Sequence, residues 1–133
     1  MRPLLALTAA AVAVTLLSGC APATVEPAPA AADGSYATLL DLRAAYEAAG
    51  GECEEWFEHD VDGALEAGDC DGDTTMQIYP DEASRDAIVD YVVSGSADIG
   101  GVVLLVGPNW ILNDADGEAL QAAVGGELVD TRP

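Results

Sequence analysis

Acidic side chains that alternate along one short stretch are the first residues whose spacing could support chemistry. Residues 69–73 read Asp-Cys-Asp-Gly-Asp, and carboxylates at alternate positions can place oxygen ligands around Ca²⁺. The ligand order of an EF-hand loop is not kept, because Gly72 comes too early and Pro80 stands where the twelfth ligand belongs. We therefore predict an acidic hairpin tip and no metal site, with a cation-responsive loop as the alternative.

His59 is the only histidine and the next candidate for chemistry. It lies among Glu58, Asp60 and Asp62. A catalytic histidine needs a nucleophile within hydrogen-bond reach and a third group that orients it, and the spacing along the sequence indicates neither. The sequence also lacks a G-x-S-x-G elbow, a phosphate-cradling glycine loop and a cluster with metal-ligand spacing. We predict that the chain is not an enzyme, with no catalytic residue and no cofactor; the alternative is a small enzyme that uses carboxylates or His59.

An aromatic side chain follows a tight turn in residues 107–110, which read Gly-Pro-Asn-Trp. Trp110 could line a ligand groove, but a tryptophan flanked by Ile111 and Leu112 is more often a core residue. Asparagine at such a turn usually serves the backbone. We therefore predict that Trp110 packs in the core and that Asn109 contacts backbone rather than a ligand.

The charge balance excludes two classes of partner. The chain has 24 acidic and 4 basic residues, and its formal net charge is −20. Such a surface repels phosphate backbones, so we predict no nucleic-acid binding. It also repels anionic lipid headgroups, so any membrane attachment must come from something other than a basic patch. Solubility accounts for the charge without a dedicated acidic binding face.

The N-terminus has the layout of a secretory signal peptide. Arg2 precedes an apolar run over residues 4–17, which is shorter than the roughly 20 residues that span a bilayer. Small residues Ser18 and Gly19 then stand before Cys20. This order predicts a cleaved signal peptide over residues 1–19 rather than a transmembrane helix.

The stretch Leu17-Ser18-Gly19-Cys20 resembles the lipobox of bacterial lipoproteins. The resemblance implies a diacylglyceryl group in thioether linkage to Cys20, with cleavage before this residue. Two acyl chains suit stable anchoring, because each buried CH₂ contributes about 0.8 kcal/mol and one chain alone binds only marginally. The resemblance thus implies a lipid-anchored protein on the extracytoplasmic face of the cell membrane; the alternative is an ordinary signal peptide followed by a chance cysteine.

The segment after Cys20 is too poor in large apolar residues to bury a core. Proline and alanine dominate residues 21–35, and Val25 is the only large apolar side chain among them. We predict a lipidated cysteine and an extended tether over residues 20–35, which reaches up to roughly 45 Å at about 3.1 Å per residue. Residues 36–133 are long enough for one modest core, so we predict a single domain there.

Two cysteines are left if Cys20 carries lipid. The lipobox places Cys53 and Cys70 outside the cytoplasm, where thiols oxidise. We predict a Cys53–Cys70 disulfide, which closes a loop of about seventeen residues and contributes on the order of 3 kcal/mol. Free thiols are the alternative. The spacing is not the C-x-x-C of a redox pair, and two thiols with one histidine do not supply a zinc site.

Capping signals predict the helices that position these residues. Thr38 begins a capping-box pattern, and Gly50 with Gly51 ends the helix that follows. Asp81 predicts the start of a second helix over residues 82–94, and capping residues at 113–116 predict a third helix through Val124. The apolar face expected for the second helix consists of Ala83, Ala87, Ile88, Tyr91 and Val92.

Strands are predicted between the helices. Residues 71–72, Asp-Gly, are a hairpin signal between two predicted strands, and residues 101–106 form an apolar run typical of a central strand buried on both faces. The predicted strands cover residues 64–70, 74–79, 101–106, 110–112 and 127–129, and residues 52–60 are a short strand or irregular. The order predicts an α+β domain with a small, mostly antiparallel sheet, about three helices packed on one face, and one disulfide.

The whole domain, from about Asp41 to Val129, resembles small lipoproteins of high-GC Gram-positive bacteria. The resemblance supports the anchor and the disulfide and implies no activity. It is carried by Asp41-Leu42, Ala48-Ala49-Gly50, the Cys53-x-x-Trp56 to Cys70 spacing, and residues 81–86 and 105–110.

These features predict a membrane-anchored extracytoplasmic lipoprotein that acts as a binding or interaction module of the cell envelope, with an envelope protein as possible partner. The alternatives are a small envelope enzyme and a cation-responsive structural lipoprotein. A solute-binding transport subunit is disfavoured, because one small domain leaves no cleft between two lobes.

Overall fold

The computed structural model describes residues 30–133. The predicted signal peptide, Cys20 and most of the predicted tether lie outside these residues, and the predictions about them stay predictions. Residues 30–35, which the sequence assigned to the tether, contact the domain. Ala30 packs against the core, and the carbonyl of Gly34 accepts a hydrogen bond of 2.9 Å from the Trp110 indole N–H.

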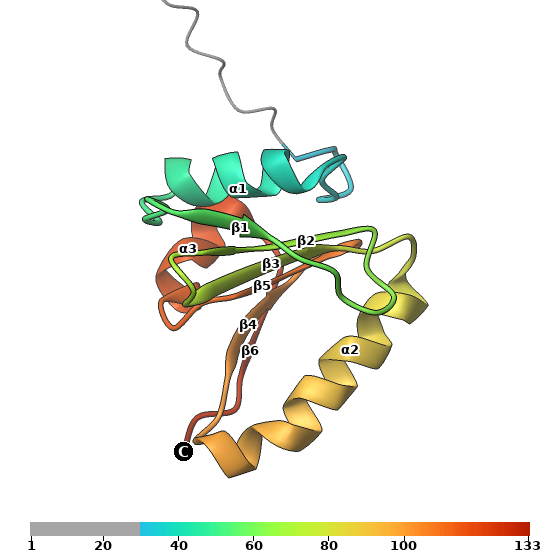
Figure 1. The fold of residues 1–133 in the computed structure, drawn as a ribbon, viewed down its shortest axis with the longest axis vertical. Coiled ribbons are helices and arrows are strands. Elements are labelled where there is room, and N and C mark those ends of the chain that lie inside the picture. The colour runs from blue at the N-terminus through green and yellow to red at the C-terminus, as the bar shows by residue number, and fades with distance from the viewer. Residues whose placement is uncertain (1–29) are drawn as a thin grey trace, which may run out of the picture.

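The described chain forms one six-stranded antiparallel sheet with three α-helices (Figure 1). The sheet order is β1-β2-β3-β5-β4-β6, and all five neighbouring pairs are antiparallel. The strands are β1 (Trp56–Glu58), β2 (Glu66–Cys70), β3 (Thr74–Ile78), β4 (Val103–Val106), β5 (Trp110–Asn113) and β6 (Glu127–Asp130). The helices are α1 (Leu39–Ala48), α2 (Glu82–Gly95) and α3 (Gly117–Val124), and a short 3₁₀ helix, η1 (Ser96–Ile99), follows α2. The predicted α+β class and antiparallel sheet are confirmed.

The predicted caps set the starts of the first two helices. The Thr38 hydroxyl accepts a hydrogen bond from the Asp41 N–H at 3.2 Å, and the Asp81 carboxylate accepts one from the Ser84 N–H at 2.8 Å. Each bond satisfies a backbone donor that a helix leaves unpaired in its first turn. Gly50, with φ +100°, follows the end of α1 in a conformation that disfavours other residues.

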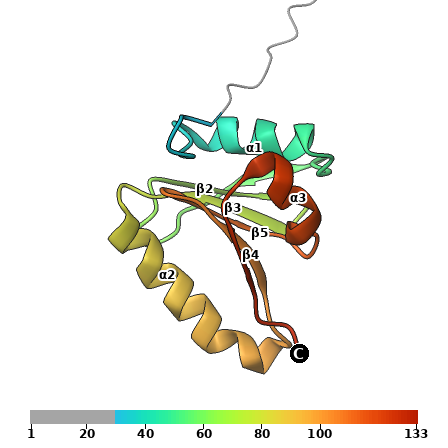
Figure 2. The same ribbon diagram turned by 180° about the vertical axis from the view of Figure 1, so that it is seen from behind.

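One face of the sheet is covered by α1 and α3, which contact each other (Figure 2). The main core lies between these helices and the sheet. Its buried members are Tyr36, Leu39, Leu42, Tyr46, Cys70, Met76, Ile78, Leu105, Trp110, Leu112, Leu120 and Val124.

The opposite face carries α2, so the prediction that all helices pack on one face is wrong. A second, smaller core lies there and contains Tyr79, Val102, Leu104 and Ile111, with partly buried apolar residues of α2 against them. The physical reason is the composition of β4 and β5. Val103, Leu104 and Leu105 are all buried although neighbours in a strand point to opposite faces, so this strand requires cover on both sides.

The apolar side of α2 also differs from the predicted one. Ala83, Ala87 and Tyr91 are exposed, and the residues that pack on the sheet are Ile88, Val89, Val92 and Val93. Polar contacts at both ends hold the helix in this orientation.

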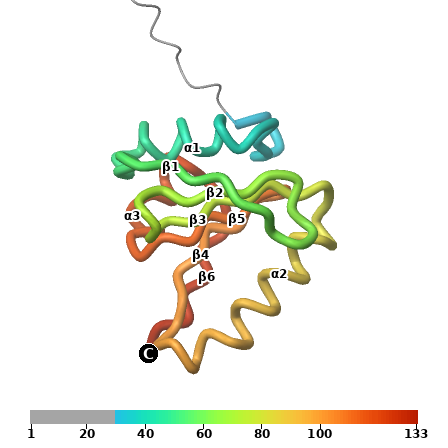
Figure 3. Tube along the Cα trace, viewed as in Figure 1, coloured from blue at the N-terminus to red at the C-terminus, as the bar shows by residue number. Residues whose placement is uncertain are grey.

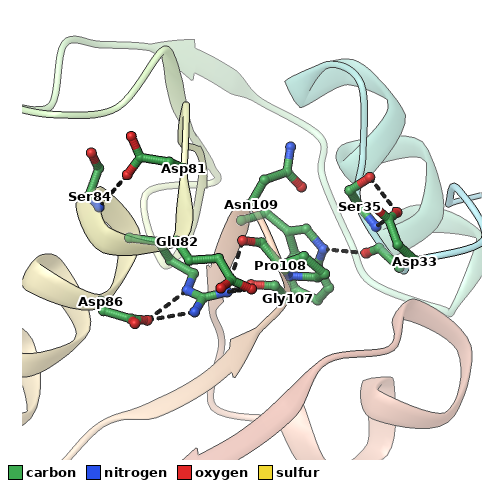
Figure 4. A network of polar contacts seen from close by, with 12 residues as sticks. Asp33, Ser35, Asp81, Glu82, Ser84, Asp86, Gly107, Pro108 and Asn109 are labelled. Atoms are coloured by element: carbon green, nitrogen blue, oxygen red, sulfur yellow. Dashed lines mark hydrogen bonds and ion pairs between the residues drawn. The ribbon is translucent and has the colours of Figure 1, made fainter.

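These end contacts come from Arg85 and Ser96. The Arg85 guanidinium donates to the carbonyls of Gly107 and Pro108 in the β4–β5 turn (Figure 4). At the other end, the Thr131 hydroxyl donates to the Ser96 hydroxyl at 2.9 Å. The trace shows α2 meeting the rest of the chain near these two ends (Figure 3). Because buried donors and acceptors must be paired, these bonds fix the rotation of a helix that has no fully buried residue.

Candidate functional site

The Cys53–Cys70 disulfide is confirmed. The two sulfur atoms are 2.02 Å apart and the two Cα atoms 4.8 Å apart. Cys70 ends β2 inside the main core, and Cys53 precedes the edge strand β1. The bond therefore ties the start of an edge strand to the core.

The acidic hairpin tip does not gather its carboxylates around a common point. Both oxygens of Asp71 accept backbone hydrogen bonds, from Glu54 N–H at 3.1 Å and from Glu55 N–H at 2.6 Å. Asp69 lies 3.5 Å from the His59 ring nitrogen instead. Among residues 30–133, no group of three or more His, Cys, Asp and Glu side chains could hold a metal ion. The Asp71 carboxylate thus fixes the path of the chain into β1.

Trp110 lies in the core, as predicted. Its side chain is fully buried, and its ring meets Tyr36 edge to face with centroids 5.5 Å apart. Asn109 does contact backbone, but not that of its own turn. Its amide accepts from the Tyr36 N–H at 3.1 Å and donates to the Tyr36 carbonyl at 2.8 Å. The sequence could not indicate this pairing, because the two residues are 73 positions apart.

The α2 side of the sheet is only half covered, and this is the most prominent candidate surface of the described chain. The second core draws its buried residues from β4, β5 and the segments next to α2, and includes none from β1, β2 or β3. We call the uncovered part the open sheet face. From the strand register and the alternation of side chains, its exposed and half-buried residues are Phe57, His59, Asp69, Thr75, Gln77 and Asn113, and the buried Ala67 shares the face.

Four side chains of the open sheet face form a row across four strands. Phe57 is paired with Asp69, Asp69 with Thr75, and Thr75 with Asn113. Neighbouring strands lie about 4.8 Å apart, so the row is about 14 Å long from Phe57 to Asn113. The Phe57 side chain stands out at one end, with 55% of its surface exposed.

One polar group in this row, the Asp69 carboxylate, has an oxygen without a hydrogen-bond partner in the described chain. This atom, Oδ1, is buried. The other oxygen of Asp69 lies 3.5 Å from the Nδ1 atom of His59. Buried polar atoms are usually satisfied, so the Oδ1 atom is an exception within the described chain.

A small apolar hollow lies beside the row, between α2 and the sheet. Its volume is about 100 Å³. It is lined by Thr75, Gln77, Ile88, Val92, Leu104, Ile111 and Asn113. Pockets for whole small molecules usually measure several hundred Å³, so this hollow suits a single side chain.

Tyr79 forms a hydrogen bond with a residue of the open sheet face. Its hydroxyl donates to the side-chain carbonyl of Gln77, and burial raises the pKa of Tyr79 to about 12. The pKa values of Tyr36 and Tyr46 are also raised, in each case mainly by burial. Folding therefore favours the neutral form of these three phenols.

The raised pKa of Tyr79 predicts a loss of stability in alkali. A phenol whose pKa is higher in the folded state stabilises the fold fully below its ordinary pKa of about 10, and this contribution is lost as the pH rises towards 12. We expect the free energy of unfolding to fall between pH 10 and 12, and to fall less steeply in Tyr79→Phe. Urea unfolding at a series of pH values measures the slope. Tyr91→Phe, at an exposed position, is the control, and equal slopes for the two variants would contradict the prediction.

A second hollow, of about 320 Å³, surrounds His59. It is lined by Leu39 and by residues of the β1–β2 connection and its flanks. The structure joins the His59 ring to Asp69, and no hydrogen bond connects it to a serine, threonine or cysteine of the described chain. A base next to a carboxylate without an adjacent nucleophile is not a covalent catalytic arrangement.

No family model, curated protein or solved structure matches this chain. Within residues 30–133, none of the helices has the length and apolar character to cross a membrane.

The open sheet face was not predicted from the sequence. Phe57, Thr75 and Asn113 attracted no prediction of a site. One signal was available, because the polar residues Thr75 and Gln77 alternate with the apolar Met76 and Ile78, which indicates a strand with only one covered face. The apolar run in β4 lacks such alternation.

Proposed function

We propose that this chain is a lipid-anchored extracytoplasmic lipoprotein whose domain serves as a binding module of the cell envelope through the open sheet face. The observation that supports binding is the row from Phe57 to Asn113, where an exposed aromatic residue lies beside a carboxylate with one oxygen that has no hydrogen-bond partner in the described chain. Exposed aromatic residues and unpaired polar groups on a rigid sheet are features of recognition surfaces.

The anchor and the compartment rest on the lipobox ending at Cys20, and the disulfide is consistent with them. Disulfides persist in oxidising compartments and are rare in the cytosol. The acidic surface fits a domain that projects from an anionic membrane, because like charges repel.

A binding role is favoured over catalysis by the chemistry of the open sheet face. Thr75, Gln77 and Asn113 offer hydroxyl and amide groups, which bind ligands but are weak acids and bases. The one histidine has a carboxylate partner and no neighbouring nucleophile.

Photo-cross-linking in cells of the native host tests both parts of this proposal. The full chain carries p-benzoylphenylalanine in place of Phe57, or in place of Leu40 as the control, which is an exposed residue of α1. We expect a discrete adduct from position 57 in the membrane fraction and none from position 40. Adding Cys20→Ala should release the chain from the membrane and greatly reduce the adduct.

Two outcomes would contradict the proposal separately. Equal adducts from both positions, or none from position 57, would overturn the binding role of the open sheet face. Complete retention of Cys20→Ala in the membrane fraction would overturn lipid on this cysteine as the anchor. Mass spectrometry of the adduct identifies the partner.

A further inference from the structure

The arginines of the described domain are all engaged within the chain. Arg43 pairs with Glu47 at 3.0 Å, and Arg85 with Asp86 at 2.6 Å. Arg132 pairs with its near neighbour Asp130, also at 2.6 Å. The sequence contains no lysine, and acidic residues outnumber basic ones by 24 to 4. The domain thus presents a strongly negative field, which attracts cationic partners and repels anionic ones.

Asp69 is the carboxylate of the open sheet face, and no arginine of the described chain pairs with it. One of its oxygens is buried and unpaired, and the other lies 3.5 Å from His59. Hydrogen bonds from a cationic donor to a carboxylate are shorter and stronger than neutral ones. The Asp69 side chain is 29% exposed, so an incoming guanidinium or ammonium group can reach the carboxylate and neutralise its charge.

Phe57 provides the second half of a cation site. It is paired with Asp69 across the β1–β2 ladder, on the same face, and more than half of its side chain is exposed. The opposite face of β1 already has an aromatic ring, a cation and a carboxylate in contact. There, the Arg43 guanidinium lies 5.0 Å from the ring centroid of Trp56 and pairs with Glu47. An aromatic ring attracts a cation over its face, and no arginine of the described chain fills this role for Phe57.

The apolar hollow beside α2 adds a second contact at the far end of the row. Its volume of about 100 Å³ suits one aliphatic side chain. Because the row is about 14 Å long and an extended peptide advances about 3.4 Å per residue, the two contacts are about four residues apart. Residues separated by four point to the same side of an extended chain. Thr75 and Asn113, at the rim of the hollow, can bind the main chain of such a peptide.

We infer that the open sheet face binds an extended basic segment of a protein partner, with an Arg or Lys side chain against Phe57 and Asp69 and an apolar side chain about four residues away in the hollow beside α2. This inference rests on the proposed binding role and specifies the partner's chemistry. Charge complementarity and the spacing of the two contacts favour this ligand over a polyol, because uncharged hydroxyl groups gain nothing from the negative field of the domain.

A titration with short peptides tests the inference. The probe is acetyl-Gly-Arg-Gly-Ser-Gly-Leu-Gly-amide, and the matched control peptide carries citrulline, an uncharged analogue, in place of arginine. The full chain in detergent is titrated with each peptide by calorimetry at low salt. We expect the arginine peptide to bind about tenfold more tightly than the citrulline peptide, because a charge-assisted hydrogen bond is lost.

Matched variants distinguish a site from the general acidic field. Asp69→Asn should weaken binding of the arginine peptide about tenfold, whereas Asp90→Asn, which removes the same charge from an exposed position on α2, should change it less than about twofold. Phe57→Ala should weaken binding about threefold, whereas Leu40→Ala should leave it unchanged. Thermal melting of each variant tests whether it is folded. If Asp69→Asn does not fold, the comparison of Phe57→Ala with Leu40→Ala decides.

Three results would overturn the inference. They are no binding of the arginine peptide, equal binding of the two peptides, and equal losses in Asp69→Asn and Asp90→Asn. If a partner still cross-links at position 57 in any of these cases, the proposed binding role stands and only the basic-peptide chemistry falls. A cross-linked glycan in place of a protein would overturn the inference in the same way.

Discussion

Replacing Trp110 by alanine is expected to lower the free energy of unfolding by about 3–5 kcal/mol, the range for a fully buried aromatic residue. The Trp110 indole packs against the first residues of the described chain. It meets the Tyr36 ring, and its N–H donates to the Gly34 carbonyl. A variant this destabilised would lose a large part of the stability typical of a small domain. Urea unfolding followed by circular dichroism measures the change.

Two further variants test the packing around Trp110. Trp110→Phe keeps an aromatic ring but loses the bond to Gly34, and should cost about 1–2 kcal/mol from the hydrogen bond. Gly107→Ala should also be destabilising, because a Cβ atom there would lie 2.0 Å from the indole. If Trp110→Ala cost less than about 1 kcal/mol, the tight packing around this residue would be refuted.

Removing the disulfide is the second change with a large expected effect. The double variant Cys53→Ala/Cys70→Ala should lose about 3 kcal/mol, because the cross-link restricts a loop with a sequence separation of 17 in the unfolded chain. Several acidic side chains in this loop repel one another, which adds to the cost of closing it without the bond. Unfolding by urea with and without a reducing agent measures the loss.

The reducing agent supplies the internal control. It should destabilise the natural chain by about as much as the double substitution does, and it should leave the double variant unchanged. Hydrogen exchange should show the largest local increase at β1, because this edge strand pairs with β2 alone. Sensitivity of the double variant to reductant, or a loss well below 1 kcal/mol, would contradict the assigned role of the bond.

The disulfide also bears on the open sheet face. Phe57 lies on β1, a strand of only three residues, and the bond at Cys53 holds the chain that leads into it. The Asp71 carboxylate holds the same segment through two backbone N–H groups. The edge strand that carries the exposed aromatic ring is therefore fixed by contacts outside the strand itself.

Local signals in the sequence were sufficient to place most of the helices and strands. The caps at Thr38 and Asp81 act on backbone groups three residues away, and the Asp-Gly hairpin turns within a few residues. In that turn Asp71 has φ 55° and Gly72 φ 79°, the left-handed conformation that these residue types tolerate. The pairing of Cys53 with Cys70 was predicted from the number of cysteines together with the lipobox resemblance, which sets Cys20 apart.

Only the tertiary structure decided which face each helix covers. The uninterrupted apolar run of β4 already required cover on both sides, but it did not say that α2 would provide it. The rotation of α2 depends on Arg85 reaching the carbonyls of Gly107 and Pro108, more than twenty residues away. Asn109 likewise finds its partner at Tyr36 from the far part of the chain.

The open sheet face also depends on contacts between residues that are far apart in the sequence. Phe57, Asp69, Thr75 and Asn113 come from four strands, and they form one row only because the sheet places β5 beside β3. The sequence by itself determined the local elements, because their hydrogen bonds join residues a few positions apart. The candidate site depends on strand order and on where α2 ends its cover, and both follow from contacts between segments that are distant in the chain.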